Sequence, residues 1–314
     1  MQPERLWFLA AVIIYGIGLL YSIFVWRRGF QKNNWTSYIL VSIAFIAHTL
    51  ALTHRGFSLK QCPVNNLYEA TTFILWTISL GSLIFGIWPR LRFIGVFTAP
   101  LLFCVGVFAM MPGLDPEYGD QPNFINGWSS LHAALIMLGY GAFGLSAITG
   151  SMFLTQERNI KLHRASALFS MLPSIQRLEK LITQSLVAGL ILLTSGLFIG
   201  GFFLDLPDVL GKITTAPNAE ISVPMASSGG PAYITSGPEL EFWKNNPDSI
   251  SFWNDSKVIW SLLVWTFYTG LLIAHIKLDQ RGRRYAWLAI FAFFFVIFTF
   301  WGTNLLSSIH NPKS

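Results

Sequence analysis

The residues of this chain with the clearest chemical potential are its six histidines, because five of them lie in or beside long apolar stretches. A titratable side chain is costly to place in such a stretch, and one found there marks a functional site by default. For any single histidine, a helix cap or an interhelical hydrogen bond explains the position equally well. The five are His48, His54, His132, His275 and His310. The sixth, His163, lies in a basic connection, where we expect it to be solvated.

His132 and His310 could form one site if the stretches that carry them reach the same membrane surface. Two imidazoles from different helices can ligate a haem iron from both axial sides and leave the porphyrin edge facing a partner. Zinc fits less well, because zinc sites use at least three protein ligands and neither histidine has a cysteine or carboxylate beside it. This pair of histidines therefore predicts a haem site.

Eight apolar runs must position these side chains. Most of them are long enough to cross a bilayer, which takes about 20 residues of helix. Helices are expected because lipid offers the backbone no other hydrogen-bond partners. The runs cover about 6–26, 36–54, 67–88, 93–111, 128–154, 181–204, 257–276 and 285–306. The sequence thus predicts an all-α integral membrane protein, a bundle of about eight transmembrane helices that forms a single domain over residues 1–314.

The distribution of basic residues predicts the orientation of this bundle. The odd-numbered connections between runs hold two thirds of the 21 lysines and arginines, with few acidic residues beside them. Loops with an excess of lysine and arginine lie on the cytoplasmic side. Both termini, His132 and His310 are therefore expected at the outer surface. The long connection at about 205–256 is also outside, and its Pro, Gly, Ser and Asn content predicts a loop.

Composition excludes several classes of protein. Charged residues make up 11% of the chain, against about a quarter in soluble domains. The net charge of +6 does not indicate nucleic-acid binding, because the basic residues fall in short clusters between apolar runs. No C-x-x-C occurs, so the chain has neither a thiol-redox motif nor its own site for covalent haem attachment. The composition therefore predicts a protein in a lipid bilayer that does not bind nucleic acid.

Three segments resemble the cytochrome c assembly membrane proteins of the CcsA/ResC type, a family that includes HemX-like members. PVNNLYE at 63–69, followed by Trp76, is similar to the family's P-x-S-N-x-Y-E block. LH at 131–132, with GY at 139–140, is similar to its fifth-span pattern, and WGTNLL at 301–306 with His310 is similar to its closing motif. The resemblance covers about residues 36–310.

This resemblance implies roles for four of the histidines. In the family, two outer histidines flank an external haem site, and these correspond to His132 and His310. Two further histidines bind haem inside the bundle, and these correspond to His48 and His275, so the resemblance selects His48 over His54. The implied cofactor is haem b, bound non-covalently.

A tryptophan-rich outer block that cradles haem in the family is only partly present. The matching segment, FWNDSKVIW at 252–260, keeps Trp253, Asp255, Lys257 and Trp260. The resemblance implies that Trp253, Asp255 and Trp260 bind haem. It departs from the family at Asn254, Ser256 and Val258. Without the resemblance, the two tryptophans would be interpreted as interfacial anchors.

The resemblance implies that the chain binds haem and exports or presents it, outside the cytoplasm, for covalent attachment to apocytochrome c. This is cytochrome c biogenesis of the system II type, at the cell (inner) membrane, with a second assembly membrane subunit. The sequence identifies no catalytic residue, and whether the chain is a subunit of a cytochrome c synthase (haem lyase) stays open. Two alternatives also stay open. One is a HemX-like membrane regulator of haem biosynthesis, favoured by the altered tryptophan block, and the other is a transporter without haem.

Overall fold

The computed structural model describes residues 2–28, 35–59, 62, 66–115, 127–162, 173–203, 222–224, 231–233, 256–278 and 280–306. Within these ranges, eight helices are long and apolar enough to cross a membrane. They are α1 Pro3–Arg28, α2 Trp35–Leu59, α3 Leu67–Gly86, α4 Gly95–Ala109, α5 Gly127–Lys161, α7 Ile175–Phe203, α10 Ser256–Lys277 and α11 Arg283–Leu306. This confirms the prediction of an all-α bundle of about eight transmembrane helices.

Shorter elements lie between the helices. The 3-10 turns η1 Arg92–Ile94 and η2 Pro112–Leu114 stand on either side of α4. Within the connection that we predicted to be a loop, strands β1 Ser222–Pro224 and β2 Pro231–Tyr233 pair in antiparallel register, with Val223 opposite Ala232. These three-residue strands add a local pairing to that connection and leave the helical fold class unchanged.

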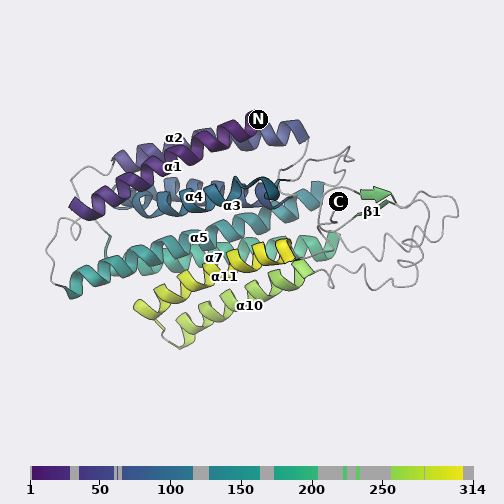
Figure 1. Cartoon of the computed structure of the whole chain (residues 1–314). Helices are drawn as coiled ribbons and strands as arrows, with labels where there is room; N and C mark the ends of the chain where they lie inside the picture. The colour runs from purple at the N-terminus through teal and green to yellow at the C-terminus, as the bar shows by residue number, and fades with distance from the viewer. Residues whose placement is uncertain are drawn as a thin grey trace.

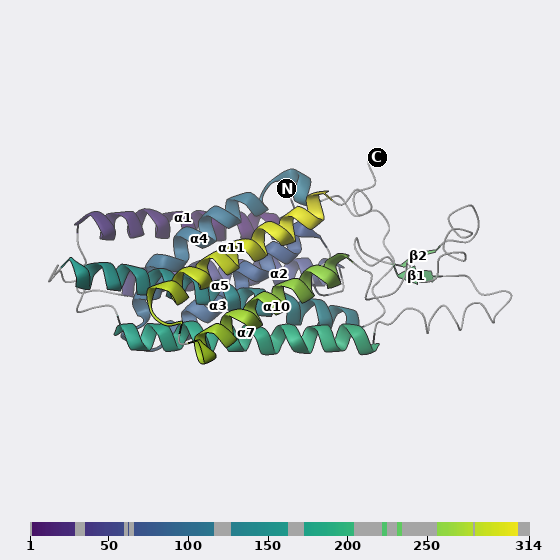
Figure 2. The same ribbon diagram turned by 90° about the horizontal axis from the view of Figure 1, so that it is seen from below.

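The eight helices form two groups that meet at α5 (Figures 1 and 2). In the first helix group (α1 to α4), α1 packs against α2 and α4, and α3 packs against α2 and α4. In the second helix group (α5, α7, α10 and α11), α10 packs against α7 and α11. α5 contacts α7 and α11 within its own group and α3 in the other. Helix α5 is therefore the element that joins the two groups.

The start of α1 and the end of α11 lie at the same end of the bundle (Figure 2), as an even number of spans requires. We call this end the predicted outer end. The assignment of this end to the outside of the cell rests on the basic residues alone and stays a prediction.

Helices α5 and α7 approach closely because glycines face the contact. A Cβ on Gly139 would lie 3.1 Å from the carbonyl oxygen of Gly189, and a Cβ on Gly196 would lie 2.8 Å from Cγ1 of Ile136. Small residues at helix contacts in membranes allow this backbone approach, and van der Waals packing then holds the pair. The same approach brings the first turns of α5 against α7, where His132 lies.

Candidate functional site

His132 lies near the start of α5, half-buried at the predicted outer end. Its Nδ1 lies 2.6 Å from the carbonyl oxygen of Gly196 on α7. A carbonyl only accepts hydrogen bonds, so Nδ1 carries the proton and donates, which leaves the lone pair of the ring on Nε2. Histidines that bind metals commonly donate their other ring N–H to a backbone carbonyl in this way. His132 thus has the tautomer that ligation of a metal through Nε2 needs.

The other predicted members of the outer site divide between described and undescribed parts of the chain. Helix α11 is described as far as Leu306, so His310 lies outside the described residues, and so do Trp253 and Asp255. Trp260 lies half-buried in the first turns of α10. Beside it, the hydroxyl of Ser261 lies 3.3 Å from the hydroxyl of Tyr140, which is two turns beyond His132 on α5. This contact ties the start of α10 to the helix that carries His132.

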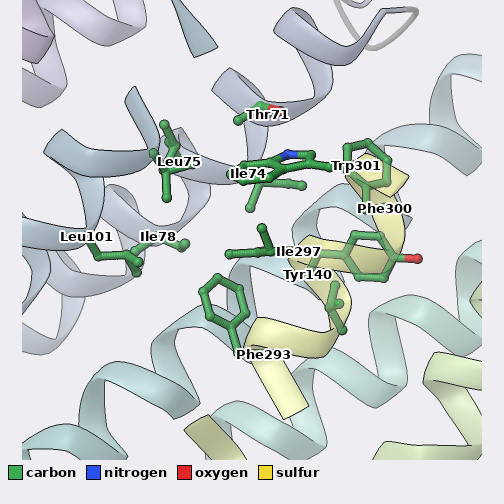
Figure 3. Close-up of a pocket in the computed structure, with 12 residues that line it drawn as sticks. Thr71, Ile74, Leu75, Ile78, Leu101, Tyr140, Phe293, Ile297, Phe300 and Trp301 are labelled. Atoms are coloured by element: carbon green, nitrogen blue, oxygen red, sulfur yellow. The ribbon is translucent and has the colours of Figure 1, made fainter. Parts of the chain in front are cut away.

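A small apolar cavity of about 20 Å³ lies between the two helix groups, and Figure 3 shows side chains that line it. Its walls come from α3, α4, α5 and α11, and they include Thr71, Tyr140, Phe300 and Trp301. Trp301 stacks on Phe108 of α4 with ring centroids 3.8 Å apart. The cavity lies below the level of His132 and has room for about one water molecule, so it does not admit a porphyrin in this structure.

His48 lies near the middle of α2 and is completely buried. Its ring centroid is 5.0 Å from that of Phe8 on α1. Its Nδ1 lies 3.5 Å from the hydroxyl oxygen of Tyr15, also on α1. Its Nε2 is buried and has no hydrogen-bond partner among the described residues. A buried nitrogen left without a partner calls for a functional explanation, and a bare imidazole nitrogen fits the iron of a haem.

His275 lies in the last turn of α10, at the end of the bundle opposite to the predicted outer end. Its Nδ1 lies 3.1 Å from the carbonyl oxygen of Gln280, and its Nε2 lies 3.4 Å from the hydroxyl of Thr183 on α7. The ring stacks on Tyr285 of α11 with centroids 4.1 Å apart and planes within 17° of parallel. Both ring nitrogens have partners, so in this structure His275 joins α7, α10 and α11.

The structure does not bring His48 and His275 together. Helix α2 packs in the first helix group and α10 in the second, against α7 and α11. One residue is at mid-helix and the other is in the last turn of its helix. A haem ligated by both would need the two groups to rearrange. The shared inner site therefore stays a prediction.

A buried charge cluster that the sequence did not reveal closes the first helix group at the predicted outer end. The guanidinium of Arg55 lies 2.9 Å from Glu69, 2.7 Å from Asp115 and 3.4 Å from Glu4. Arg5 lies 3.0 Å from Asp115. In the sequence, the feature that could have indicated this cluster is Arg55 itself, a lone arginine at the end of an apolar run, directly after the exposed His54. Because charges with this little exposure are retained only when paired, the cluster fixes the ends of α1, α2 and α3 together, seven residues along α2 from His48.

Comparison with known proteins agrees with this architecture. The sequence profile of the cytochrome c assembly protein family matches residues 64–215 and 248–310. The chain belongs to the cytochrome c assembly protein family. The resemblance found in its motifs is thereby confirmed, and cytochrome c biogenesis is the process in which a multi-pass membrane protein of this family takes part.

Several cytochrome c biogenesis proteins named CcsA are similar to this chain over most of its length. That of Microcystis aeruginosa is 27% identical, and the match covers 85% of this chain and 83% of the relative. That of Mesostigma viride is 26% identical over 95% of this chain and 90% of the relative. That of Pyropia yezoensis is 24% identical, and the match covers 95% of this chain and 91% of the relative. These longer matches take in segments before residue 64, where the family profile begins.

Proposed function

We propose that the chain binds haem b non-covalently and presents it outside the cytoplasm for covalent attachment to apocytochrome c. The observation that carries this proposal is the hydrogen bond from Nδ1 of His132 to the carbonyl of Gly196, at 2.6 Å, in a member of the cytochrome c assembly protein family. That bond keeps the proton of this half-buried imidazole on Nδ1. The lone pair that could ligate iron at the predicted outer end is therefore on Nε2. A haem held there would supply its vinyl groups to the thiols of a partner chain.

In this proposal the residues of the chain act by ligation and packing. His132 and His310 would hold the haem iron, and ligation by two imidazoles would supply a low-spin centre. Trp253 and Trp260 pack against the porphyrin, and Asp255 lies in the same outer segment. No thiol pair is present in the sequence to keep the apocytochrome reduced. A second assembly membrane subunit and the apocytochrome are therefore the partners that we propose, at the inner membrane with the functional face outside.

The test uses His132→Gly and His310→Gly in the full-length protein. Each should lower the haem content or convert the spectrum from low spin to high spin, because one axial position opens while the bundle stays folded. Imidazole added from outside should restore the low-spin spectrum. His163→Ala is the matched control and should leave both readouts unchanged. If both glycine variants are produced normally and keep the wild-type spectrum and activity, the outer haem site is wrong.

Two other functions make different predictions in the same protein. A HemX-like regulator of haem biosynthesis would bind haem but would not restore cytochrome c assembly in a strain that lacks it. A transporter without haem would show no Soret absorption after purification. The CcsA relatives carry the name of cytochrome c biogenesis, which supports the proposed function over both. Complementation of an assembly-deficient strain separates presentation of haem from regulation.

A further inference from the structure

The three described histidines that we assign to haem differ in what their ring nitrogens contact. Both nitrogens of His275 have partners, on Thr183 and Gln280. In His132, Nδ1 is held by a carbonyl of α7. In His48, Nδ1 contacts Tyr15, and Nε2 is buried without a hydrogen-bond partner among the described residues. Of these three, His48 therefore has a buried and unsatisfied ring nitrogen that a ligand would satisfy.

The contacts of Tyr15 determine which nitrogen of His48 carries the proton. The hydroxyl of Tyr15 donates to Oγ of Ser79 on α3 at 3.1 Å. A phenol has one hydrogen, so towards His48 the same oxygen can only accept. Nδ1 of His48, 3.5 Å away, must then be the donor. The proton is on Nδ1 and Nε2 is bare.

These three side chains form a buried chain across three helices. Ser79 and His48 have no exposed surface, and Tyr15 is 1% exposed. The carbonyl oxygen of Thr72 on α3 is a second acceptor for the ring N–H of His48, and Nε2 has no hydrogen-bond partner among the described residues. Phe8 covers the ring from α1, in contact with Tyr68. In such a setting the ring has no exposed surface through which bulk water reaches Nε2.

We propose that Tyr15 is a positioning residue that holds His48 as its Nδ1–H tautomer and thereby presents Nε2 as the ligand for haem iron within the membrane. The inference rests on the haem-binding function proposed above. A hydrogen bond that Nδ1 donates fixes the ring orientation and raises the basicity of the ligating nitrogen. Ser79 helps to fix the same tautomer, because its hydroxyl oxygen accepts the hydrogen bond from Tyr15. Helix α1, which lies before the segment that the family profile matches, thus contributes to the inner ligand.

The ligand atoms follow from this assignment. Nε2 of His48 loses no hydrogen bond when it accepts iron, although the helices around this completely buried ring must part to admit a porphyrin. Nε2 of His275 must in addition lose its contact with Thr183. His48 is therefore the primary ligand of the inner site, and His275 can join it only after a rearrangement of the second helix group.

The experiment compares Tyr15→Phe and Ser79→Ala with two matched controls in the full-length protein in nanodiscs. Tyr21→Phe makes the same change on α1 at a tyrosine that packs against the core. Ser82→Ala makes the same change on α3 at a serine whose hydroxyl donates to the carbonyl oxygen of Ser79 in its own helix. The first readout is the pair of ring ¹⁵N shifts of His48 without haem, assigned by their loss in His48→Gln. The second is the affinity for haem in a His132→Gly background, where the outer site is removed.

The wild type should show a protonated Nδ1 and a bare Nε2. Tyr15→Phe removes the acceptor, and Ser79→Ala lets Tyr15 donate to Nδ1, so both should move the proton towards Nε2. Haem affinity in the His132→Gly background should fall by about 10- to 100-fold, the usual effect of losing such a partner. Tyr21→Phe and Ser82→Ala should change neither readout. Should Tyr15→Phe fail to fold, Ser79→Ala carries the same test.

A wild-type His48 protonated on Nε2, or a tautomer unchanged in Tyr15→Phe or Ser79→Ala, would overturn the inference. Haem loading that depends on His132 and is indifferent to His48→Gln would also overturn it, while the outer site would stand. A wild-type protein that binds no haem at all would instead reject the proposed function, and the ligand role of His48 with it.

Discussion

At the scale of single residues, the identity of the group that an imidazole touches decides its chemistry. The carbonyl of Gly196 at 2.6 Å fixes the tautomer of His132. The hydroxyl of Tyr15 does the same for His48 at 3.5 Å. His275, with a partner on each nitrogen, is held as an interhelical contact. All three histidines lie in or beside apolar runs, yet their ring nitrogens have different partners. They therefore differ in which nitrogen could bind iron.

Cys62 allows a prediction about reactivity at this scale. Burial raises the pKa of its thiol, and the negative charge of Glu69 raises it further. A thiol with a raised pKa holds less thiolate at neutral pH, and the thiolate is the nucleophile. In a Cys104→Ser variant, Cys62 should react with a water-soluble maleimide more slowly than free cysteine at pH 7. Its rate should continue to rise with pH after the rate of free cysteine has levelled off.

The same variant in denaturing detergent is the control for Cys62, because unfolding removes both causes of the shift. There its rate should approach that of free cysteine. A folded protein in which Cys62 already reacts at the rate of free cysteine at pH 7 would contradict the prediction.

At the scale of elements, the α5–α7 contact is the part of the bundle that sets up the outer site. A Cβ at Gly196 would lie 2.8 Å from Ile136 and 3.3 Å from the carbonyl oxygen of His132. Neither neighbour can move far without separating the helices, because the approach of the two backbones depends on the missing side chain. The ligand geometry of His132 is therefore a property of two helices.

Substitution of Gly196 tests this directly. Gly196→Leu should force α5 and α7 apart, break the bond to His132 and lower haem loading as His132→Gly does. Overpacking of this kind typically destabilises a protein by about 1–3 kcal/mol. Gly270→Leu on α10 is the matched control, because a Cβ there meets nothing within 4 Å among the described residues. Haem content and thermal unfolding of both variants decide the matter. Equal haem content in both would contradict the role of the contact.

The buried charge cluster is the second feature of this scale. Removing Arg55 leaves Glu4, Glu69 and Asp115 near one another without their common cation. Breaking a buried ion pair from one side costs about 3–5 kcal/mol. Arg55→Met should therefore lower the unfolding temperature strongly, and Arg55→Lys should lower it less, because lysine keeps the charge without the fork of donors.

Arg90→Met is the comparison for Arg55→Met, because Arg90 is exposed in the turn between α3 and η1. It should leave the unfolding temperature nearly unchanged. An Arg55→Met protein as stable as Arg90→Met would show that the cluster does not hold the three helices together.

At the scale of the whole molecule, the orientation of the bundle decides which side receives haem. The start of α1 and the end of α11 lie at one end of the bundle (Figure 2), and the lysine and arginine distribution assigns that end to the outside. Fusion reporters at positions 30, 165 and 282 should report the cytoplasm, and reporters at 118, 230 and 314 should report the outside. A reporter at 230 that is active only in the cytoplasm would overturn the orientation, because every connection alternates with its neighbours.

The sequence by itself determined the number of spans, their approximate ends, the family and the candidate histidines. The length of an apolar run and the types of residue in a motif are local properties, and lipid forces each such run to be a helix. Residue 132 was identified as a candidate ligand on the same local grounds, from a motif and from its place at the start of a span.

Only the tertiary structure decided which side chains meet. In a membrane, the face of a helix that packs against protein is as apolar as the face that meets lipid, so sequence pattern does not show which neighbour a residue will touch. The sequence therefore paired His48 with His275, while the packing places them in separate helix groups. It also left unseen the partners of Arg55 and the link from His48 through Tyr15 to Ser79, because each joins residues far apart in the chain.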